Sequence, residues 1–250
     1  MIELNKDKCI GCGKCAKVCP GLVLKMEGGY PMIVGEACIS CGHCQSTCLA
    51  GAIYLTPSPE NVANAKNALE ESLLARRSIR NYKPESPKRA MIEEVLNLAS
   101  WAPSSKNQNL NGWTVILGGN HVRRALESAL DWCREHGKNR GLVRLYESGV
   151  NLITCDAPCL IFSWIHDGAI NPEIDCAIAM TTAQMLLHDR GLGTCWGGFC
   201  TRLFSADPEL LKIAGIPDGA KLCCTLMVGY ADEDYLTIPN RPAAKINWKD

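Results

Sequence analysis

The sequence predicts an α+β protein in which a small cysteine-rich unit precedes a larger domain of mixed strands and helices. Two observations support this prediction. Eight of the 16 cysteines fall within residues 9–48, in two runs of identical spacing. Further along the chain, apolar segments of strand length are interspersed with long helical patterns, without the strict alternation of a doubly wound sheet. We expect a unit at residues 1–56, a linker at 57–67 and a domain at 68–250.

The first unit is organised around two cysteine runs with the spacing C-x2-C-x2-C-x3-C. This spacing resembles the run with which bacterial-type ferredoxins bind [4Fe–4S] clusters. Three closely spaced thiolates wrap one cubane there, and the fourth ligates the other cluster. One cluster is therefore assigned to Cys9, Cys12, Cys15 and Cys48. The second is assigned to Cys19, Cys38, Cys41 and Cys44.

Zinc and disulfide bonds are the alternative uses for so many cysteines. Structural zinc usually takes two C-x2-C pairs separated by a longer loop, and disulfides need an oxidising compartment. We expect no signal peptide, because the first residues, MIELNKDKC, contain no apolar segment. The sequence therefore favours iron–sulfur clusters in a reducing cytoplasm.

The overall composition is that of an ordinary soluble globular protein. Hydrophobic residues make up 47% of the chain, charged residues 21%, and the formal net charge is zero. No basic run of the kind that marks partners such as nucleic acid or a membrane surface is present. No apolar stretch approaches the length of a membrane-spanning helix. We therefore expect neither of these partners.

Apolar periodicity predicts the elements of the second domain. The expected helices are one starting at residues 61–64 and running to 78, then 88–103, 121–136 and 173–190. The expected strands are 113–119, 157–165 and 221–231, with 194–199 as a strand or a loop and 239–250 as an extended tail. The segment 173–190 is apolar nearly all round, which indicates burial in a core or an interface.

A second group of motifs lies beyond the linker. The segments are RRSIRNY (76–82), APSSKNQNLNGW (102–113) and GLGTCWGGF (191–199), followed near the end by Arg241. Three arginines and a serine in one short segment suit a phosphate, because the planar guanidinium fork matches phosphate oxygens. Taken singly, the same segments also fit a solvated basic helix end, a helix stop and a helix C-cap.

In this order the segments resemble the FMN-binding nitroreductase family, over roughly residues 70–250. The resemblance implies a central, mainly antiparallel sheet flanked by helices, and a homodimer with FMN at the subunit interface. The apolar helix 173–190 fits such an interface, and burial in a core explains it nearly as well.

The resemblance also implies residues for the phosphate half of FMN. Arg76 and Ser78 should contact the phosphate, with Arg241 arriving from the tail. Arg77 should lie beside the ribityl–phosphate region. Arg80 should lie near flavin N1 and O2, where a cation stabilises the negative charge of the reduced ring.

The flavin ring is assigned a second set of residues by the same resemblance. Ser104, Ser105 and Asn107 should line the flavin edge. Gly197 and Gly198 should direct backbone N–H groups toward N5, where glycine allows the backbone to come close.

One position departs from the family pattern, which often reads N-x-Q-P after the serines. Here the chain reads Asn107-Gln108-Asn109-Leu110, so Asn109 stands in the glutamine position and the proline is absent. The role of Asn109 is therefore left open.

The remaining cysteines and the histidines show no ligand spacing. We expect most of these cysteines to be small core hydrophobes. They are Cys133, Cys155, Cys159, Cys176, Cys195, Cys200, Cys223 and Cys224.

Together the two parts suggest an enzyme. Clusters pass single electrons, and a flavin accepts them one at a time and delivers two together as a hydride. We expect electrons to cross from the clusters to FMN and to reduce a small organic acceptor, such as a nitroaromatic, a quinone or an activated alkene. An external ferredoxin, another low-potential donor or NAD(P)H would supply them. The alternative is an electron-transfer or redox-sensing protein whose flavin serves a partner protein.

Overall fold

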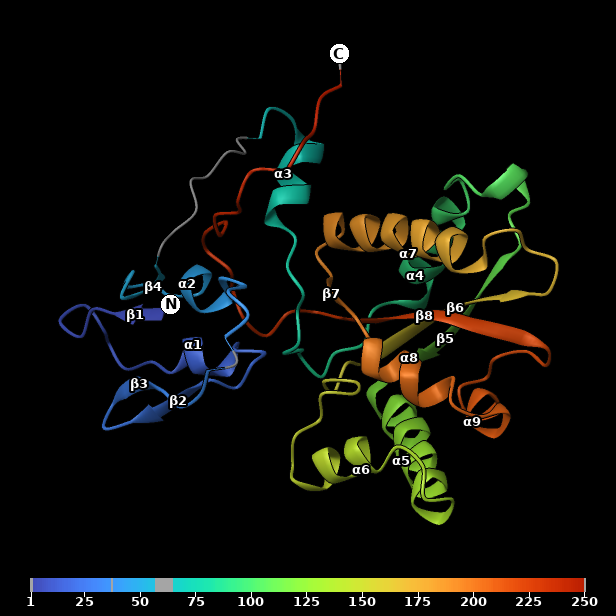
Figure 1. Ribbon diagram of the computed structural model, residues 1–250, viewed down its shortest axis with the longest axis horizontal. Coiled ribbons are helices and arrows are strands. Elements are labelled where there is room, and N and C mark those ends of the chain that lie inside the picture. The colour runs from blue at the N-terminus through green and yellow to red at the C-terminus, as the bar shows by residue number, and fades with distance from the viewer. Residues whose placement is uncertain (1, 37, 57–64, 250) are drawn as a thin grey trace. The chain divides into compact units, whose positions relative to one another are not determined.

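Two compact units make up the chain (Figure 1). The computed structural model describes residues 2–36, 38–56 and 65–249. The first unit comprises Met1–Ala75 together with the C-terminal tail Glu233–Asp250, and the second comprises Arg76–Asp232. The chain therefore passes between the units twice.

These boundaries differ from those expected from the sequence. The contacts group helix α3 (Ala68–Ala75) and the tail with the first unit, whereas the sequence suggests a second domain running from 68 to 250. Most of the expected linker at 57–67, and the expected helix start at 61–64, lie outside the described residues.

The first unit contains two short antiparallel strand pairs. Strand β1 (Ile2–Leu4) pairs with β4 (Ile53–Leu55), and β2 (Leu24–Glu27) pairs with β3 (Tyr30–Ile33). The pairing of β1 with β4 joins the two ends of the cysteine-rich segment.

Two one-turn helices carry cysteines in this unit. They are α1 (Lys14–Lys17) and α2 (His43–Ser46). Each begins directly after a left-handed glycine, Gly13 with φ 75° and Gly42 with φ 77°. Glycine tolerates this conformation because it lacks a Cβ. The equivalent geometry of the two turns reflects the sequence duplication.

The second unit is built on one four-stranded sheet with the order β5-β6-β8-β7. Its strands are β5 (Asn111–Leu117), β6 (Cys159–His166), β7 (Gly193–Trp196) and β8 (Ala220–Gly229). All three pairings are antiparallel, which confirms the sheet type that the family resemblance implies.

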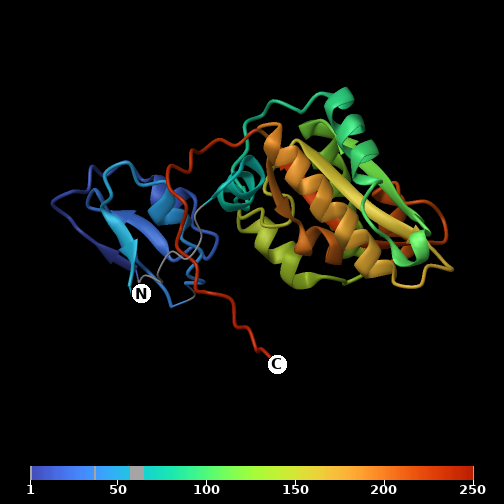
Figure 2. The same cartoon turned by 90° about the horizontal axis from the view of Figure 1, so that it is seen from above.

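Helices cover both faces of this sheet. Helices α4 (Arg89–Ala99) and α7 (Pro172–Asp189) lie on one face, and Figure 2 shows α7 lying across the strands. The other face is covered by α5 (Gly119–Glu135), α6 (Arg140–Glu147), α8 (Gly198–Phe204) and α9 (Pro208–Ile213). Alternate residues of β6 enter the two cores, Phe162 on one side and Ile161 on the other. Burial of both faces explains the continuous apolar run at 157–165.

The expected helix around residues 67–78 ends earlier than its sequence pattern indicates. Helix α3 stops at Ala75, because the following residues pair with the sheet. Ser78 forms a parallel bridge with Thr194, and the Ile79 N–H donates to the Thr194 carbonyl at 2.9 Å. The 194–199 segment, expected as a strand or a loop, is the end of β7 followed by the start of α8.

Helix α7 packs into the core with one face only. Cys176, Met180, Ala183 and Leu187 are fully buried on that face, whereas Ile174 is 59% exposed. Core packing therefore explains the apolar residues on the buried face of α7, and it does not explain the exposed Ile174. No helix among the described residues has the length and apolar character needed to cross a membrane.

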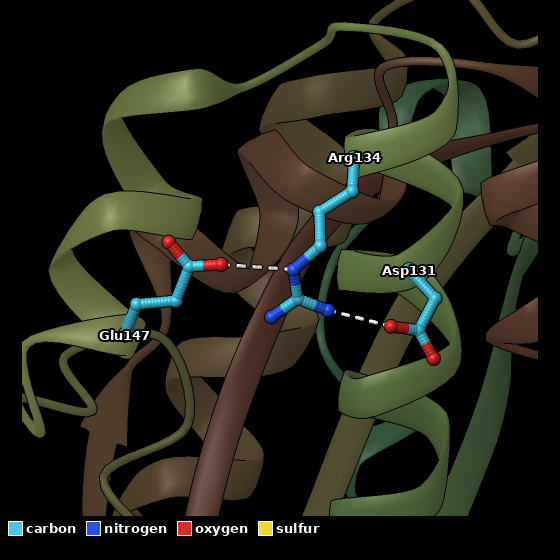
Figure 3. A network of polar contacts seen from close by, with 3 residues as sticks. All are labelled: Asp131, Arg134 and Glu147. Carbon is cyan, nitrogen blue, oxygen red and sulfur yellow. Dashed lines mark hydrogen bonds and ion pairs between the residues drawn. The ribbon is translucent and has the colours of Figure 1, made fainter.

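An ion-pair network links α5 to α6 (Figure 3). Arg134 Nε donates to Glu147 at 2.9 Å, and one Nη contacts Asp131 at 2.5 Å. The three side chains are between 38% and 66% exposed, and exposed pairs of this kind stabilise a fold only weakly. Packing of the buried Leu130 and Leu142 therefore dominates the contact between these helices.

Substitution of Phe162 tests whether core packing, rather than the surface ion pairs, stabilises the second unit. Its ring is fully buried and meets Phe204 edge to face at 5.5 Å between centroids. We expect Phe162→Ala to lower the free energy of unfolding by about 3–5 kcal/mol, because it leaves a cavity in the core. Chemical denaturation measures this loss. Arg134→Ala is the control and should shift the midpoint little; an equal loss in both variants would contradict the assignment.

Candidate functional site

Four cysteines from both runs line the first cavity of the cysteine-rich unit. They are Cys9, Cys12, Cys15 and Cys48. The rest of the wall is mainly apolar, apart from Lys14. The N–H of Ala52 donates to the Cys48 sulfur at 3.3 Å, which is a contact that tunes the potential of a thiolate-bound cluster. This cavity collects the four residues that the spacing assigns to one cluster.

A second cavity collects the other four cysteines. They are Cys19, Cys38, Cys41 and Cys44. Each cavity thus takes three cysteines from one run and the fourth from the other run. Among the described residues, no three His, Cys, Asp or Glu side chains are close enough together to hold a single ion. The thiols instead surround a space, and this donor set fits a polyatomic cluster with sulfur ligands.

Burial disfavours the thiolate form of two of the cavity cysteines. Burial raises the pKa of Cys15, and burial together with the nearby Cys41 raises the pKa of Cys44 to about 12. The ligand form of cysteine is the thiolate. Metal binding at these positions must therefore release protons, which couples cluster assembly to folding of the unit.

The arginine segment, residues 76–80, lies against β7. The bridge between Ser78 and Thr194 brings together two of the motifs, which are widely separated in the sequence. A Cβ added to Gly193 would approach Ile79 to within 2.8 Å, so the close contact requires glycine there. This close contact with Ile79 explains the glycine at the start of β7 in the segment at 191–199.

Backbone carbonyls hold two of the guanidinium groups on this segment. Arg77 Nη1 donates to the Arg76 carbonyl at 2.7 Å, and Arg80 Nη1 donates to the Ser78 carbonyl at 3.2 Å. Arg77 is buried, and the other two arginines are half-buried. Three positive charges are thus concentrated within five residues, which suits an anionic ligand.

Neighbouring titratable groups respond to this positive charge. Burial, followed by the charges of Arg76 and Arg77, lowers the pKa of His188. Burial and the two neighbouring guanidinium groups thus both disfavour the cationic form of His188. Burial raises the pKa of the Cys195 thiol, whereas the charge of Arg80 acts in the opposite direction. Cys195 thus stays a protonated core thiol beside the arginine segment.

The loop at residues 104–109, called the serine loop below, is anchored by Asp175 of α7. The N–H and the hydroxyl of Ser105 both donate to Asp175 Oδ1 at 3.0 Å, and Asn171 Nδ2 donates to the Ser105 hydroxyl at 2.9 Å. The sequence suggests for Asp175 only a favourable interaction with the helix N-terminus. Its role as the anchor of this loop was missed, because the two positions lie 70 residues apart.

Asn109, the departure from the family pattern, shapes the same loop. Its N–H donates to the Ser104 hydroxyl at 2.9 Å, and the Ser104 hydroxyl contacts Asn109 Oδ1 at the same distance. Lys106, Asn107 and Asn109 all have left-handed backbones, with φ between 47° and 55°. Asparagine accepts this conformation better than most residues, so Asn109 fits the loop that the chain forms.

The two glycines after β7 differ in their surroundings. The Gly197 N–H donates to the Thr225 carbonyl at 2.8 Å, so it is engaged in the sheet rather than directed toward a ligand. Gly198 is exposed, and a Cβ placed there would meet nothing within 4 Å. Gly198 is therefore the glycine at which another molecule can approach the backbone.

Helix α7 holds both the serine loop and strand β7. Gln184 is buried and donates to Thr194 Oγ1 at 3.1 Å, while it accepts from Trp196 Nε1 at 3.1 Å. The serine loop is fixed at Asp175, nine residues earlier on the same helix, or about 14 Å along its axis. Gln184 was also missed, because its place in an apolar helix carries no sign of these two bonds.

Arg241 is grouped apart from the other arginines. It is exposed in the C-terminal tail, which belongs to the first unit. The structure thus brings residues 76–80 to β7 through the bridge between Ser78 and Thr194, and it ties Ser105 to α7 through Asp175. It leaves Arg241 outside this constellation within the second unit.

Comparisons with known proteins match both units. The model of the nitroreductase family matches residues 73–230, and that of a 4Fe-4S dicluster domain matches residues 1–49. Two proteins named 4-nitrobenzoate reductase are each 24% identical to the chain. The one from Nocardioides sp. aligns over 71% of this chain and 89% of its own length, and the one from Pseudomonas putida over 64% and 84%.

Solved structures show the same fold. A nitroreductase with bound FMN from Bacteroides fragilis has a TM-score of 0.64 at 19% identity. A second one, from Desulfitobacterium hafniense, has a TM-score of 0.60 at 22% identity. Each alignment covers 74% of this chain and 100% of the other chain.

The anchor at Asp175 can be tested through flavin binding. We expect Asp175→Ala to weaken FMN binding about tenfold or more, because the serine loop loses two hydrogen bonds to a carboxylate. Titration of flavin-free protein with FMN, followed by quenching of flavin fluorescence, measures the dissociation constant. Asp189→Ala, at the exposed far end of the same helix, is the matched control. Equal affinities in the two variants would show that the anchor is irrelevant to the flavin.

Proposed function

The chain belongs to the nitroreductase family, and on this premise we propose that it passes electrons from two [4Fe–4S] clusters to FMN and then to a small organic acceptor. Membership makes it an oxidoreductase with a 4Fe-4S ferredoxin-like unit at its N-terminus. The proposal adds the number of clusters, the direction of electron flow and the class of acceptor.

The pair of four-cysteine cavities is the observation that carries this proposal. Each cavity offers the ligand set of one cubane, and among the described residues these four are the thiols that line it. Clusters move electrons singly, whereas reduction of an organic acceptor needs two. A flavin in the second unit would connect the two kinds of transfer, since it accepts one electron at a time.

The residues that would hold FMN fit its chemistry. Arg76 and Ser78 present a guanidinium and a hydroxyl on the segment bound to β7, and these suit the phosphate. Arg80, tethered to the Ser78 carbonyl, would place a positive charge by the pyrimidine side of the ring. Gly198 leaves open space for the ring at the end of β7. When bound, FMN supplies the electron storage and hydride chemistry that no side chain here offers.

A second copy of the chain would complete the site. The serine loop and the strand β7, with which the arginine segment pairs, are held by α7 residues about 14 Å apart along its axis. The half-exposed apolar face of α7, which includes Ile174, is available for a homodimer contact. We propose that Ser104, Ser105 and Asn107 of one copy line the flavin held by the arginines of the other. Arg241 would reach the phosphate as the family resemblance implies.

The donor and the acceptor follow from the same arrangement. A low-potential one-electron donor such as a ferredoxin matches the entry point that clusters provide, and NAD(P)H would serve as a donor to the flavin itself. The relatives named 4-nitrobenzoate reductase support a nitroaromatic acceptor, with quinones and activated alkenes as chemically similar choices. None of the described cysteines forms a disulfide bond, which supports a reducing cytoplasm as the compartment.

Removal of one cluster ligand tests the electron route. We expect Cys12→Ala to lower the iron content from about eight to about four atoms per chain and to abolish turnover driven by reduced ferredoxin. Turnover driven by chemically pre-reduced flavin should persist. Cys133→Ala, a buried thiol outside both cavities, should behave as wild type. Full ferredoxin-driven turnover in Cys12→Ala would exclude the route, and turnover only with a partner protein would favour the electron-transfer alternative.

The phosphate assignment has its own test. We expect Arg76→Ala to weaken FMN binding roughly 10- to 100-fold, because a charge-assisted hydrogen bond to phosphate contributes about 1.5–3 kcal/mol. Riboflavin lacks the phosphate, so its affinity should change little. Arg123→Ala, on the exposed side of α5, is the control. A parallel loss of riboflavin and FMN affinity would place Arg76 elsewhere.

A further inference from the structure

The C-terminal tail from Glu233 to Pro239 packs along the cysteine-rich unit (Figure 2). It contacts both one-turn helices that carry cluster cysteines, α1 and α2. The segment lies beyond the residues matched to either family. It therefore belongs neither to the dicluster sequence pattern nor to the flavin domain, although its contacts place it in the cluster unit.

Glu233 brings a carboxylate to α1. It forms an ion pair with Lys17 at 2.5 Å and lies 3.8 Å from Lys14, and its side chain is only 6% exposed. Lys14 lines the first cavity and precedes Cys15. The carboxylate thus offsets positive charge beside the first cluster position. The lysine side chains are 46% and 36% exposed, but the carboxylate itself is buried, so its charge is screened less than that of a surface carboxylate.

Backbone bonds fasten the next residues to α2. The Leu236 N–H donates to the Ser46 carbonyl at 2.7 Å, and Thr47 Oγ1 donates to the Asp234 carbonyl at 3.0 Å. The first of these bonds satisfies a carbonyl at the C-terminus of α2, where the helix itself offers no partner. The ring of Tyr235 meets His43 edge-on, with 5.1 Å between centroids.

Pro239 closes the wall of the second cavity. It is buried, and a Cβ on Gly42 would lie 2.4 Å from its own Cβ. Gly42 lines the second cavity directly after Cys41. The proline ring therefore covers the outer side of the backbone that wraps the second cluster position, and it keeps water away from that peptide.

We infer that residues 233–239 are an integral part of the cluster-binding unit, in which Glu233 lowers the reduction potential of the first cluster and Pro239 shields the second from solvent. The inference rests on the two clusters proposed above. Cluster potential depends on nearby charge and on solvent exposure, and the tail brings a buried carboxylate beside the first cavity and a buried proline against the second. Glu233 and Pro239 act as positioning and tuning residues, since neither is a cluster ligand.

Glu233→Gln tests the electrostatic half of the inference. The substitution keeps the shape of the side chain and removes its negative charge. The midpoint potential of the first cluster should rise, because the unpaired lysines then favour the more negative, reduced cluster. An anaerobic redox titration of the full-length protein, followed by electron paramagnetic resonance, measures both midpoints. The second cluster should shift less.

Pro239→Ala tests the shielding half, with Pro242→Ala as the matched control. Pro242 is three residues further along and exposed. We expect the visible cluster absorbance of Pro239→Ala to bleach several-fold faster in air, while Pro242→Ala bleaches at the wild-type rate. Iron and sulfide counts before the experiment establish that each variant begins with both clusters.

Two results would overturn the inference. Unchanged midpoints in Glu233→Gln together with an unchanged bleaching rate in Pro239→Ala, both at full iron content, would reduce the tail to a passive tether. Wild-type protein without iron and sulfide would overturn the proposed function itself. The metal analysis therefore separates failure of the tail's role from failure of the clusters.

Discussion

Thiol ligation across the two cysteine runs is the constraint on which the first unit depends. Its buried apolar core is small, and two of the six buried core residues, Cys15 and Cys44, are themselves cavity thiols. Units of this size bury too little apolar surface to be stable without further links, and metal sites commonly provide them. Because each cavity takes its fourth cysteine from the other run, each proposed cluster would also join the two halves of the unit.

A different constraint organises the second unit. Helix α7 lies against the sheet with one apolar face, and two of its polar residues hold the segments around the candidate flavin site. Asp175 fixes the serine loop, and Gln184 fixes the strand that the arginine segment pairs with. The same helix thus packs the core and positions both ligand-binding segments. Buried polar residues with satisfied hydrogen bonds are well suited to this, since any displacement leaves them unpaired.

Local patterns made much of the fold predictable. The cysteine spacing, through its resemblance to ferredoxin runs, predicted which four thiols line the same cavity, because the ligand loops are short and the pattern is nearly self-contained. Helices α4, α5 and α7 and the main strands followed from periodicity. The rest depended on distant contacts. The sequence could not show that helix α3 ends at Ala75, since the reason is the bridge from Ser78 to Thr194. Asp175, Gln184 and the packing of the tail were missed for the same reason.

The most direct test of the account is the order in which the redox groups change after mixing with a reductant. Anaerobic protein would be mixed rapidly with less than one equivalent of reduced low-potential donor, and the cluster and flavin signals followed separately. Delivery through the clusters requires a cluster signal that appears first and decays as the flavin becomes reduced. Flavin reduction with no transient cluster signal, or clusters that stay reduced beside an oxidised flavin, would contradict it.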